Sequence, residues 1–129
     1  MNAYNSTHFD PPAPLASVTL RHYSDNRSID DVLMLIDTGA DVSLIRQDAV
    51  NRLGLTILAD SPYELTGFDG AISHAFAVQS RLAFCNRTFR GRFLLIDQPI
   101  GVIGRDILNL LPLLFDGPNQ VWSEYRSNQ

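Results

Sequence analysis

A carboxylate stands directly after a run of apolar residues in the first third of the chain. Asp37 follows the apolar residues 32–36 and is itself followed by Thr-Gly-Ala. Burying a charge is unfavourable unless it is paired, so a carboxylate in this place is either stabilised by partners or used in chemistry. The simpler interpretation is a turn aspartate, because Asp and Gly are common in turns. The context favours chemistry, since Asp41 and a second apolar segment come next.

The composition is that of an ordinary globular domain. The chain has 129 residues, of which 45% are hydrophobic and 19% are charged, which is enough for one modest core. A net charge of −4 argues against nucleic acid or an anionic membrane as partner. Arg87, Arg90 and Arg92 cluster, but they alternate with other residues along a predicted strand, and we expect a solvated strand face.

Cysteine and histidine usage indicates neither a disulfide nor a metal. Cys85 is the only cysteine, so no intrachain disulfide can form. The three histidines are far apart and match no metal-ligand spacing, so we expect no metal and no cofactor. Residues 1–14 lack the basic and apolar regions of a signal peptide, and no apolar run is long enough to span a bilayer. We therefore expect a cytoplasmic protein without a membrane partner.

The pattern along the chain predicts many short strands. Residues 1–14 are polar and proline-rich and are expected to form a flexible tail, which leaves 15–129 as the single domain. The first predicted elements are strands at 15–23 and 29–36 and a helix at 46–54 ended by Gly54. Extended runs at 61–80 follow, joined by a turn at Asp69-Gly70, and then a strand pair at 81–97 with its turn at Asn86-Arg87. The last elements are a loop at 98–104, a helix at 105–111 and a hairpin at 112–125. This tally favours a closed or sandwich-like β fold.

Two motifs together resemble the retropepsins, the single-domain aspartic proteases of retroviruses and retroelements, and their bacterial relatives. The first is Asp-Thr-Gly-Ala-Asp at 37–41, and the second is Val-Ile-Gly-Arg-Asp-Ile-Leu at 102–108. In that family the second motif opens a conserved helix and lies against the Asp-Thr-Gly loop. Each motif occurs once, in the family's order, with a flap-sized hairpin between them. The resemblance spans about residues 15–125 and implies a mainly β, closed retropepsin-like barrel with a flap hairpin and one or two short helices.

The resemblance also implies where a second carboxylate comes from. Pepsin-like enzymes carry two Asp-(Thr/Ser)-Gly loops in one chain, whereas this chain carries only one. The second carboxylate is therefore expected to be Asp37 of another copy, in a homodimer with the site on its two-fold axis. Such a pair holds one proton and activates water to cleave an extended peptide, as in aspartic proteases generally. Thr38 would brace the two loops, and Gly39 would let the backbone bend.

Further site residues are carried over from the family by position. Asp41 is expected to lie beside the substrate backbone and to form a structural ion pair with Arg105 at the base of the loop, although a plain surface pair is the alternative. Asp106 would sit in the first turn of the helix, where a negative charge is favourable.

The substrate-binding surface is expected to come from the flap and from apolar walls. The hairpin tip would close over the peptide, although it could be a hairpin and nothing more. Core packing is the competing interpretation for two of the wall residues, Leu35 and Val102. The predicted residues are Gly67, Phe68, Asp69 and Gly70 in the flap, and Leu35, Ala40, Pro99, Ile100 and Val102 in the walls.

Two other functions remain open. The chain could be a retropepsin-like dimer that binds peptides but cleaves them slowly or not at all, or a structural strand-exchange dimer in which Asp37 does not face its mate. The intact Asp-Thr-Gly argues against the first alternative, because a pure scaffold has no need to keep the carboxylate. Retropepsin dimers are tied by terminal strands, so Trp122 and Tyr125 on the last strand pack either in the core or at that interface.

Overall fold

The structure is a computed structural model that describes residues 1–66 and 69–126, without the side chains of residues 59–61 and 73. The elements in chain order are β1 (Asn2–Ala3), β2 (Leu15–Arg21), β3 (Ser28–Ile36), β4 (Leu44–Arg46), α1 (Gln47–Leu53), β5 (Ile57–Thr66), β6 (Ile72–Phe84), β7 (Arg87–Ile96), β8 (Gly101–Ile103), α2 (Arg105–Leu108), β9 (Leu113–Asp116) and β10 (Val121–Glu124). Strands dominate and both helices are short, as the sequence predicts.

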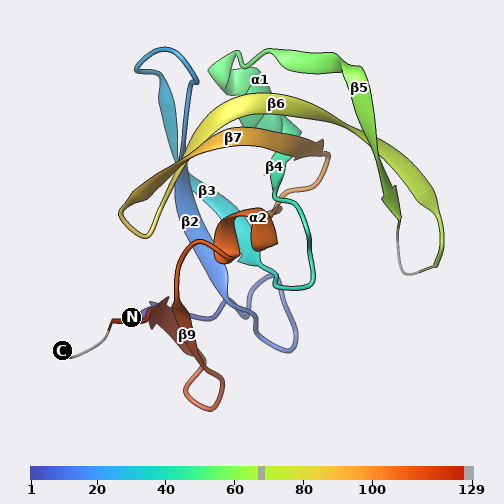
Figure 1. Ribbon diagram of the computed structural model, residues 1–129. Coiled ribbons are helices and arrows are strands. Elements are labelled where there is room, and N and C mark those ends of the chain that lie inside the picture. The colour runs from blue at the N-terminus through green and yellow to red at the C-terminus, as the bar shows by residue number, and fades with distance from the viewer. Residues whose placement is uncertain (67–68, 127–129) are drawn as a thin grey trace.

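Most of the strands form a closed barrel. The large sheet has the order β2-β3-β8-β4-β7-β6-β5, and an additional pairing of β2 with β6 closes all of its members except β5 into a ring. Strand β5 continues outward with the far half of β6 as a long hairpin (Figure 1). The mainly β, closed retropepsin-like barrel with a flap hairpin is therefore confirmed.

Strand β3 carries Asp37 to the end of the barrel. Successive side chains of a strand point to opposite faces, and in the second half of β3 the buried positions are Val32, Met34 and Ile36. The first half is polar and mostly exposed, so the strand enters the core only as it approaches Asp37. The apolar run is thus the buried section of a longer strand, and Asp37 is the first residue beyond it.

Strand β8 lies between β3 and β4, the two strands that the Asp37 loop connects. It runs parallel to β3, with Leu35 opposite Val102, and antiparallel to β4, with Leu44 opposite Val102. A Cβ added to Gly101 would lie 2.5 Å from the Leu44 carbonyl oxygen. One added to Gly104 would lie 2.6 Å from the carbonyl oxygen of Val42. Only glycine at both positions lets the backbone of residues 101–104 approach that of residues 42–44 this closely.

The helix α1 confirms the sequence prediction in detail. Ala49, Val50 and Leu53 are its buried residues, and Gly54 ends it in the left-handed conformation with φ 68°. Among the described residues, no helix is long and apolar enough to cross a membrane.

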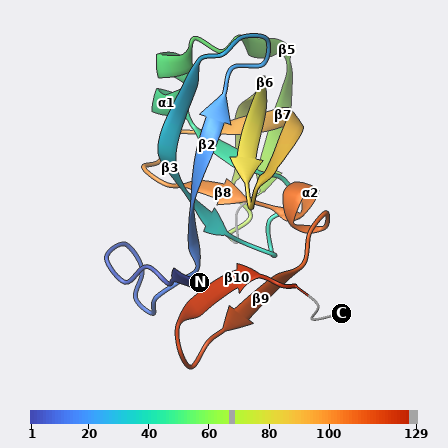
Figure 2. The same cartoon turned by 90° about the vertical axis from the view of Figure 1, so that its left-hand side faces the viewer.

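The two termini meet in a second, three-stranded sheet of order β1-β10-β9 below the barrel (Figure 2). The Trp122 ring extends from β10 into the barrel, where its centroid lies 5.8 Å from that of the Phe84 ring. Its Nε1 donates to the Leu15 carbonyl at 3.3 Å. Trp122 is 5% exposed, so core packing is the correct interpretation for it, whereas Tyr125 is 54% exposed.

The N-terminal residues differ from the expected flexible tail. Asn2 and Ala3 pair with Trp122 and Val121, and Asn5 and Ala13 form a bridge that closes the loop between them. The pairing joins segments from opposite ends of the chain, so no local sequence pattern indicates it. We call residues 5–13 the N-terminal loop.

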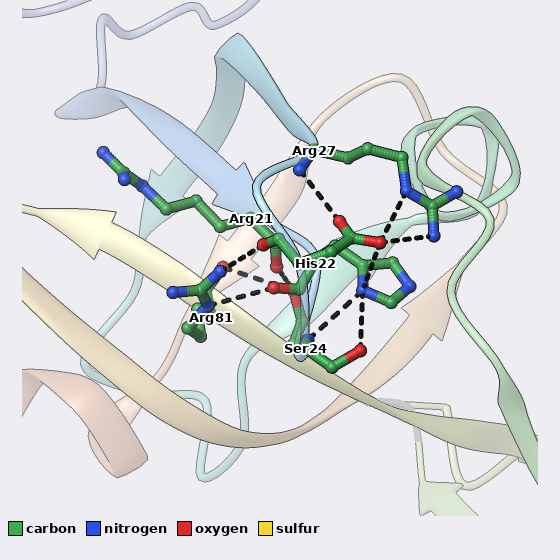
Figure 3. A network of polar contacts seen from close by, with 7 residues as sticks. Arg21, His22, Ser24, Arg27 and Arg81 are labelled. Carbon is green, nitrogen blue, oxygen red and sulfur yellow. Dashed lines mark hydrogen bonds and ion pairs between the residues drawn. The ribbon is translucent and has the colours of Figure 1, made fainter.

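The β2–β3 connection is held by a polar network at the far end of the barrel (Figure 3). The Arg81 guanidinium donates to the backbone carbonyls of His22 at 3.0 Å and Asp25 at 2.6 Å. Arg27 pairs with the Asp25 carboxylate at 2.9 Å and lowers its pKa. These contacts fix the hairpin on β6, far from the Asp37 loop.

Strand β6 is longer than the sequence pattern indicates. Residues 72–84 form one continuous strand rather than two, because the hydrogen bonds to β7 run without interruption through Ser80 and Arg81. The turn to β7 is made by Cys85 and Asn86, both with positive φ (53° and 59°), one residue earlier than expected. Arg87, Arg90 and Arg92 on β7 are exposed, which confirms the solvated face.

The close approach at Gly104 yields a stability prediction. Gly104→Ala should lower the free energy of unfolding by about 3 kcal/mol, since the new methyl group meets backbone that cannot move aside. Gly117→Ala is the matched control, because a Cβ there has nothing within 4 Å, and it should change stability by less than about 0.5 kcal/mol. Chemical denaturation of both variants measures this, and equal effects would refute the packing argument.

Candidate active site

The Asp37 carboxylate is held by the backbone of its own loop. The Gly39 amide donates to Asp37 Oδ1 at 2.9 Å, and the Asp37 amide donates to the Ile103 carbonyl of β8 at 3.0 Å. Asp37 is half-buried, while Thr38 and Gly39 are exposed. A Cβ on Gly39 would lie 3.1 Å from Asp37 Oδ1, so a side chain there would crowd the carboxylate. The carboxylate is thus oriented at the open end of the barrel, beside an uncovered Thr-Gly edge.

A buried serine ties this loop to the helix α2. Ser43 is fully buried, and its Oγ donates to Asp106 Oδ1 at 2.6 Å and accepts from the Gly104 amide at 3.0 Å. The Ser43 amide donates to the second carboxylate oxygen of Asp106 at 3.0 Å. Hydrogen bonds to a charged acceptor are among the stronger ones in proteins, so this network holds the segment around Ser43 against the start of α2. Asp106 therefore binds across to the loop, a role that sequence reasoning missed.

Arg105 supports the loop through backbone oxygens. Its Nη1 donates to the Thr38 carbonyl at 2.8 Å, and its amide donates to the Ala40 carbonyl at 2.8 Å. The sequence led us to expect an ion pair with Asp41. No ion pair between Asp41 and Arg105 occurs among the described residues of the single chain, because the guanidinium is directed to Thr38 instead. Asp41 is exposed on the other side of the loop.

Two pockets are lined in part by residues that lie close to Asp37 in the sequence. The first, of about 340 Å³, lies between the loop and the flap strand β5, and is lined by Asp41, Val42, Tyr63, Glu64, Leu65, Thr66 and Leu94. The second, of about 280 Å³, is mostly apolar and is lined by Phe9, Leu35, Gln98, Pro99, Ile100, Gly101 and Val102. We call them the flap pocket and the apolar pocket.

The apolar pocket brings together most of the predicted wall residues. Leu35, Pro99, Ile100 and Val102 all line it, although they come from β3 and from the segment around β8. Leu35 and Val102 are half-buried, opposite each other in neighbouring strands. Ala40 is half-buried as well, and its backbone supports the loop by accepting from Arg105.

Of the predicted flap residues, Asp69 and Gly70 are described, and they lie in the turn between β5 and β6. Asp69 Oδ1 accepts from the Ala71 amide at 2.9 Å, and Gly70 has a φ of 80°, which suits a tight turn. Both residues are exposed, and Gly67 and Phe68 lie outside the described residues. Sequence reasoning missed the flap-pocket residues Tyr63 to Thr66, which the predicted hairpin contained but whose facing direction only the fold decides.

Other reactive side chains lie elsewhere. Burial raises the pKa of the Cys85 thiol, and Glu124 raises it further, so this cysteine is mostly protonated at neutral pH. His74 lies across the hairpin from Glu64, with 4.0 Å between His74 Nε2 and a Glu64 carboxylate oxygen. Within the part of the chain that the structure describes, no group of three or more His, Cys, Asp or Glu residues could hold a metal ion.

A closed β barrel with one Asp-Thr-Gly loop at its end, backed by a Gly-Arg-Asp helix start, is the fold of a single-lobe acid protease. Residues 12–114 match the family model described as retroviral aspartyl protease, so the chain belongs to the retroviral aspartyl protease family. Among solved structures, it is similar to the EIAV protease in complex with the inhibitor HBY-793. The identity is 26% and the TM-score 0.55, over 75% of this chain and 86% of that one. No curated protein matches the chain.

The Ser43 network yields a second prediction. Ser43→Ala should lower the free energy of unfolding by about 2–3 kcal/mol, since it leaves the Gly104 amide without its acceptor. Ser17→Ala is the control, because the Ser17 hydroxyl is exposed and donates only to Asp31 at 3.1 Å; its effect should stay within about 0.5 kcal/mol. Thermal or urea unfolding of both variants measures the difference. A similar loss of stability in the two variants would show that the Ser43 hydrogen bonds do not stabilise the contact with Gly104 and Asp106.

Proposed function

We propose that this chain is an aspartic endopeptidase that becomes active as a homodimer, with Asp37 of each copy at a shared site. The family and the fold support aspartic protease activity in general. The observation that carries the finer proposal is the Asp37 loop itself: an oriented carboxylate at the end of the barrel, followed by an exposed Thr-Gly edge. Asp41 and Val42 of the same loop line one pocket, and Leu35, two residues before Asp37, lines another.

The reaction needs two carboxylates in different protonation states. Two such groups at hydrogen-bonding distance hold one proton between them. The ionised member takes a proton from a water molecule, whose oxygen attacks the scissile carbonyl carbon, while the protonated member donates to the carbonyl oxygen. The carboxyl that took the water proton then donates it to the amide nitrogen, while the other carboxylate takes a proton from a hydroxyl of the tetrahedral diol. The C–N bond breaks, an acid and an amine are released, and the pair again holds one proton. Each chain contributes one Asp-Thr-Gly carboxylate, so two chains are required.

The surface of the terminal sheet supports association with a second copy. Strands β1 and β9 are its two edges, and an edge strand offers unpaired backbone groups to another chain. Large apolar side chains are exposed around it, including Leu114 at 52%, Phe115 at 40% and Tyr125 at 54%. Exposed apolar residues that gather in one region are typical of an interface.

The substrate that suits the site is an extended peptide with apolar side chains near the cut. The apolar pocket offers aliphatic and proline walls to one side chain. The flap pocket contains Asp41 and Glu64, whose carboxylates favour a basic or hydrogen-bond-donating group at a neighbouring position.

Mixing an inactive copy with the active one tests the shared site. Asp37→Asn protein should cleave no member of a diverse peptide pool between acidic and neutral pH. Added in excess, it should suppress the wild type by more than tenfold, because most wild-type chains then sit in mixed dimers. Asp30→Asn is the matched control: this carboxylate lies on the polar half of β3 and accepts from Thr19 at 2.8 Å, so the variant should cleave normally and suppress nothing.

Each other outcome of that experiment has a clear meaning. Cleavage by Asp37→Asn would sink the catalytic assignment. An active wild type that excess Asp37→Asn protein leaves unchanged, and that sediments as a monomer, would refute the shared site. Peptide binding without cleavage by an intact wild-type dimer would favour the alternative, a peptide-binding module of the same fold.

A further inference from the structure

One wall of the apolar pocket comes from outside the part of the chain that matches the family. Phe9 is half-buried and lines the pocket together with Leu35, Ile100 and Val102. The family match begins at residue 12. The other aliphatic and proline lining residues lie within the matched range, so the aromatic wall is an addition made by the N-terminal loop of this chain.

The N-terminal loop is held in place from both of its ends. The Asn5 amide donates to the Ala13 carbonyl at 2.8 Å, and the Ala13 amide donates back at 3.1 Å. The Asn5 side chain accepts from the His8 amide at 2.8 Å, which braces the loop from inside. These bonds close the segment that carries Phe9 into a compact unit.

The two anchors of this loop connect it to the rest of the fold. On one side the Tyr4 amide donates to the Gln120 carbonyl at 2.8 Å, next to the β1–β10 pairing. On the other side the Pro14 carbonyl accepts from the amide of Ile36 at 3.1 Å, and Ile36 is the residue directly before Asp37. The loop is thus fixed to the strand that delivers the carboxylate, so its position relative to the pocket is defined.

We propose that Phe9 is a specificity-determining residue: it forms one wall of the apolar pocket and limits the size of the substrate side chain that the pocket accepts. This proposal rests on the proposed peptidase function. A hydrophobic pocket discriminates between side chains that differ by a methylene group about 10- to 200-fold, so the loss of a whole ring from one wall changes the preferred size measurably.

The same contact could instead make Phe9 a plug that occupies the place of a substrate side chain. The pocket argues against this, because it retains about 280 Å³ with Phe9 as part of its lining. A wall changes the ranking of substrates, whereas a plug lowers the rate for all of them alike. The two roles therefore differ in what they do to a substrate series.

The test is a series of peptides that vary only in the size of one side chain, from Ala through Leu and Phe to Trp, first on one side of the cut and then on the other. Phe9→Ala should raise the ratio of kcat/KM for Trp over Leu at one position by tenfold or more, mainly through KM. Phe9→Trp should lower the same ratio. His8→Ala is the matched control, since it changes the exposed neighbour in the same loop, and it should leave the ratio within twofold.

An unchanged ratio in both Phe9 variants would overturn the proposal. A uniform gain for every peptide in Phe9→Ala would also overturn it, and would indicate a plug. If Phe9→Ala does not fold, as judged by its unfolding midpoint, Phe9→Leu and Phe9→Trp carry the comparison. If the wild type cleaves no peptide, the peptidase function fails separately. The size ranking is then measured as Kd by titration calorimetry of the same peptides with wild type and Phe9→Ala, and an identical ranking would overturn the pocket-wall role.

Discussion

The candidate site depends on one steric constraint: the backbone at the two ends of β8, at Gly101 and Gly104, lies very close to the backbone of residues 42–44. Gly101 and Gly104 have no room for a Cβ against the carbonyls of Leu44 and Val42. Because these glycines let β8 fit between β3 and β4, the Ile103 carbonyl can accept from the Asp37 amide. The backbone of Asp37 is thus fixed by its packing against β8, and the Gly39 amide of its own loop orients the carboxylate.

Hydrogen bonds of polar side chains further stabilise the contact between residues 42–44 and the segment from β8 to α2. Ser43 is fully buried yet satisfied, with a carboxylate acceptor on one side and a backbone donor on the other. Arg105 donates a hydrogen bond to the Thr38 carbonyl rather than to Asp41, and Asp41 lines the flap pocket. The loop is therefore held from the side of α2, while Asp41 lines the flap pocket.

Local patterns predicted the parts of this site that local physics controls. The apolar run of β3, the glycine end of α1 and the two short motifs identify the barrel and the loop, because strand burial, capping and backbone crowding act over a few residues. The partners of Arg105 and Asp106 were not predictable in this way. Ser43 and Asp106 are 63 positions apart, and several acceptors compete for each donor once the chain is folded. Phe9 was missed for the same reason, since its place in the pocket follows from a pairing between the chain's two ends.

Because β6 is one continuous strand, the β5–β6 hairpin and the barrel wall share it and are mechanically connected. One half of this strand pairs with β5, and its other half forms the barrel wall with β7 and meets β2 at only three residue pairs, from Thr19 to Arg21. The pairing of β5 with β6 is irregular between Leu58 and Tyr63: these two residues are five positions apart on β5, but their partners on β6 are only two positions apart. A bulge of this kind bends the strand that carries it, so we expect the hairpin to bend most easily in β5. A displacement of the tip is then transmitted along the uninterrupted strand to its pairing with β2.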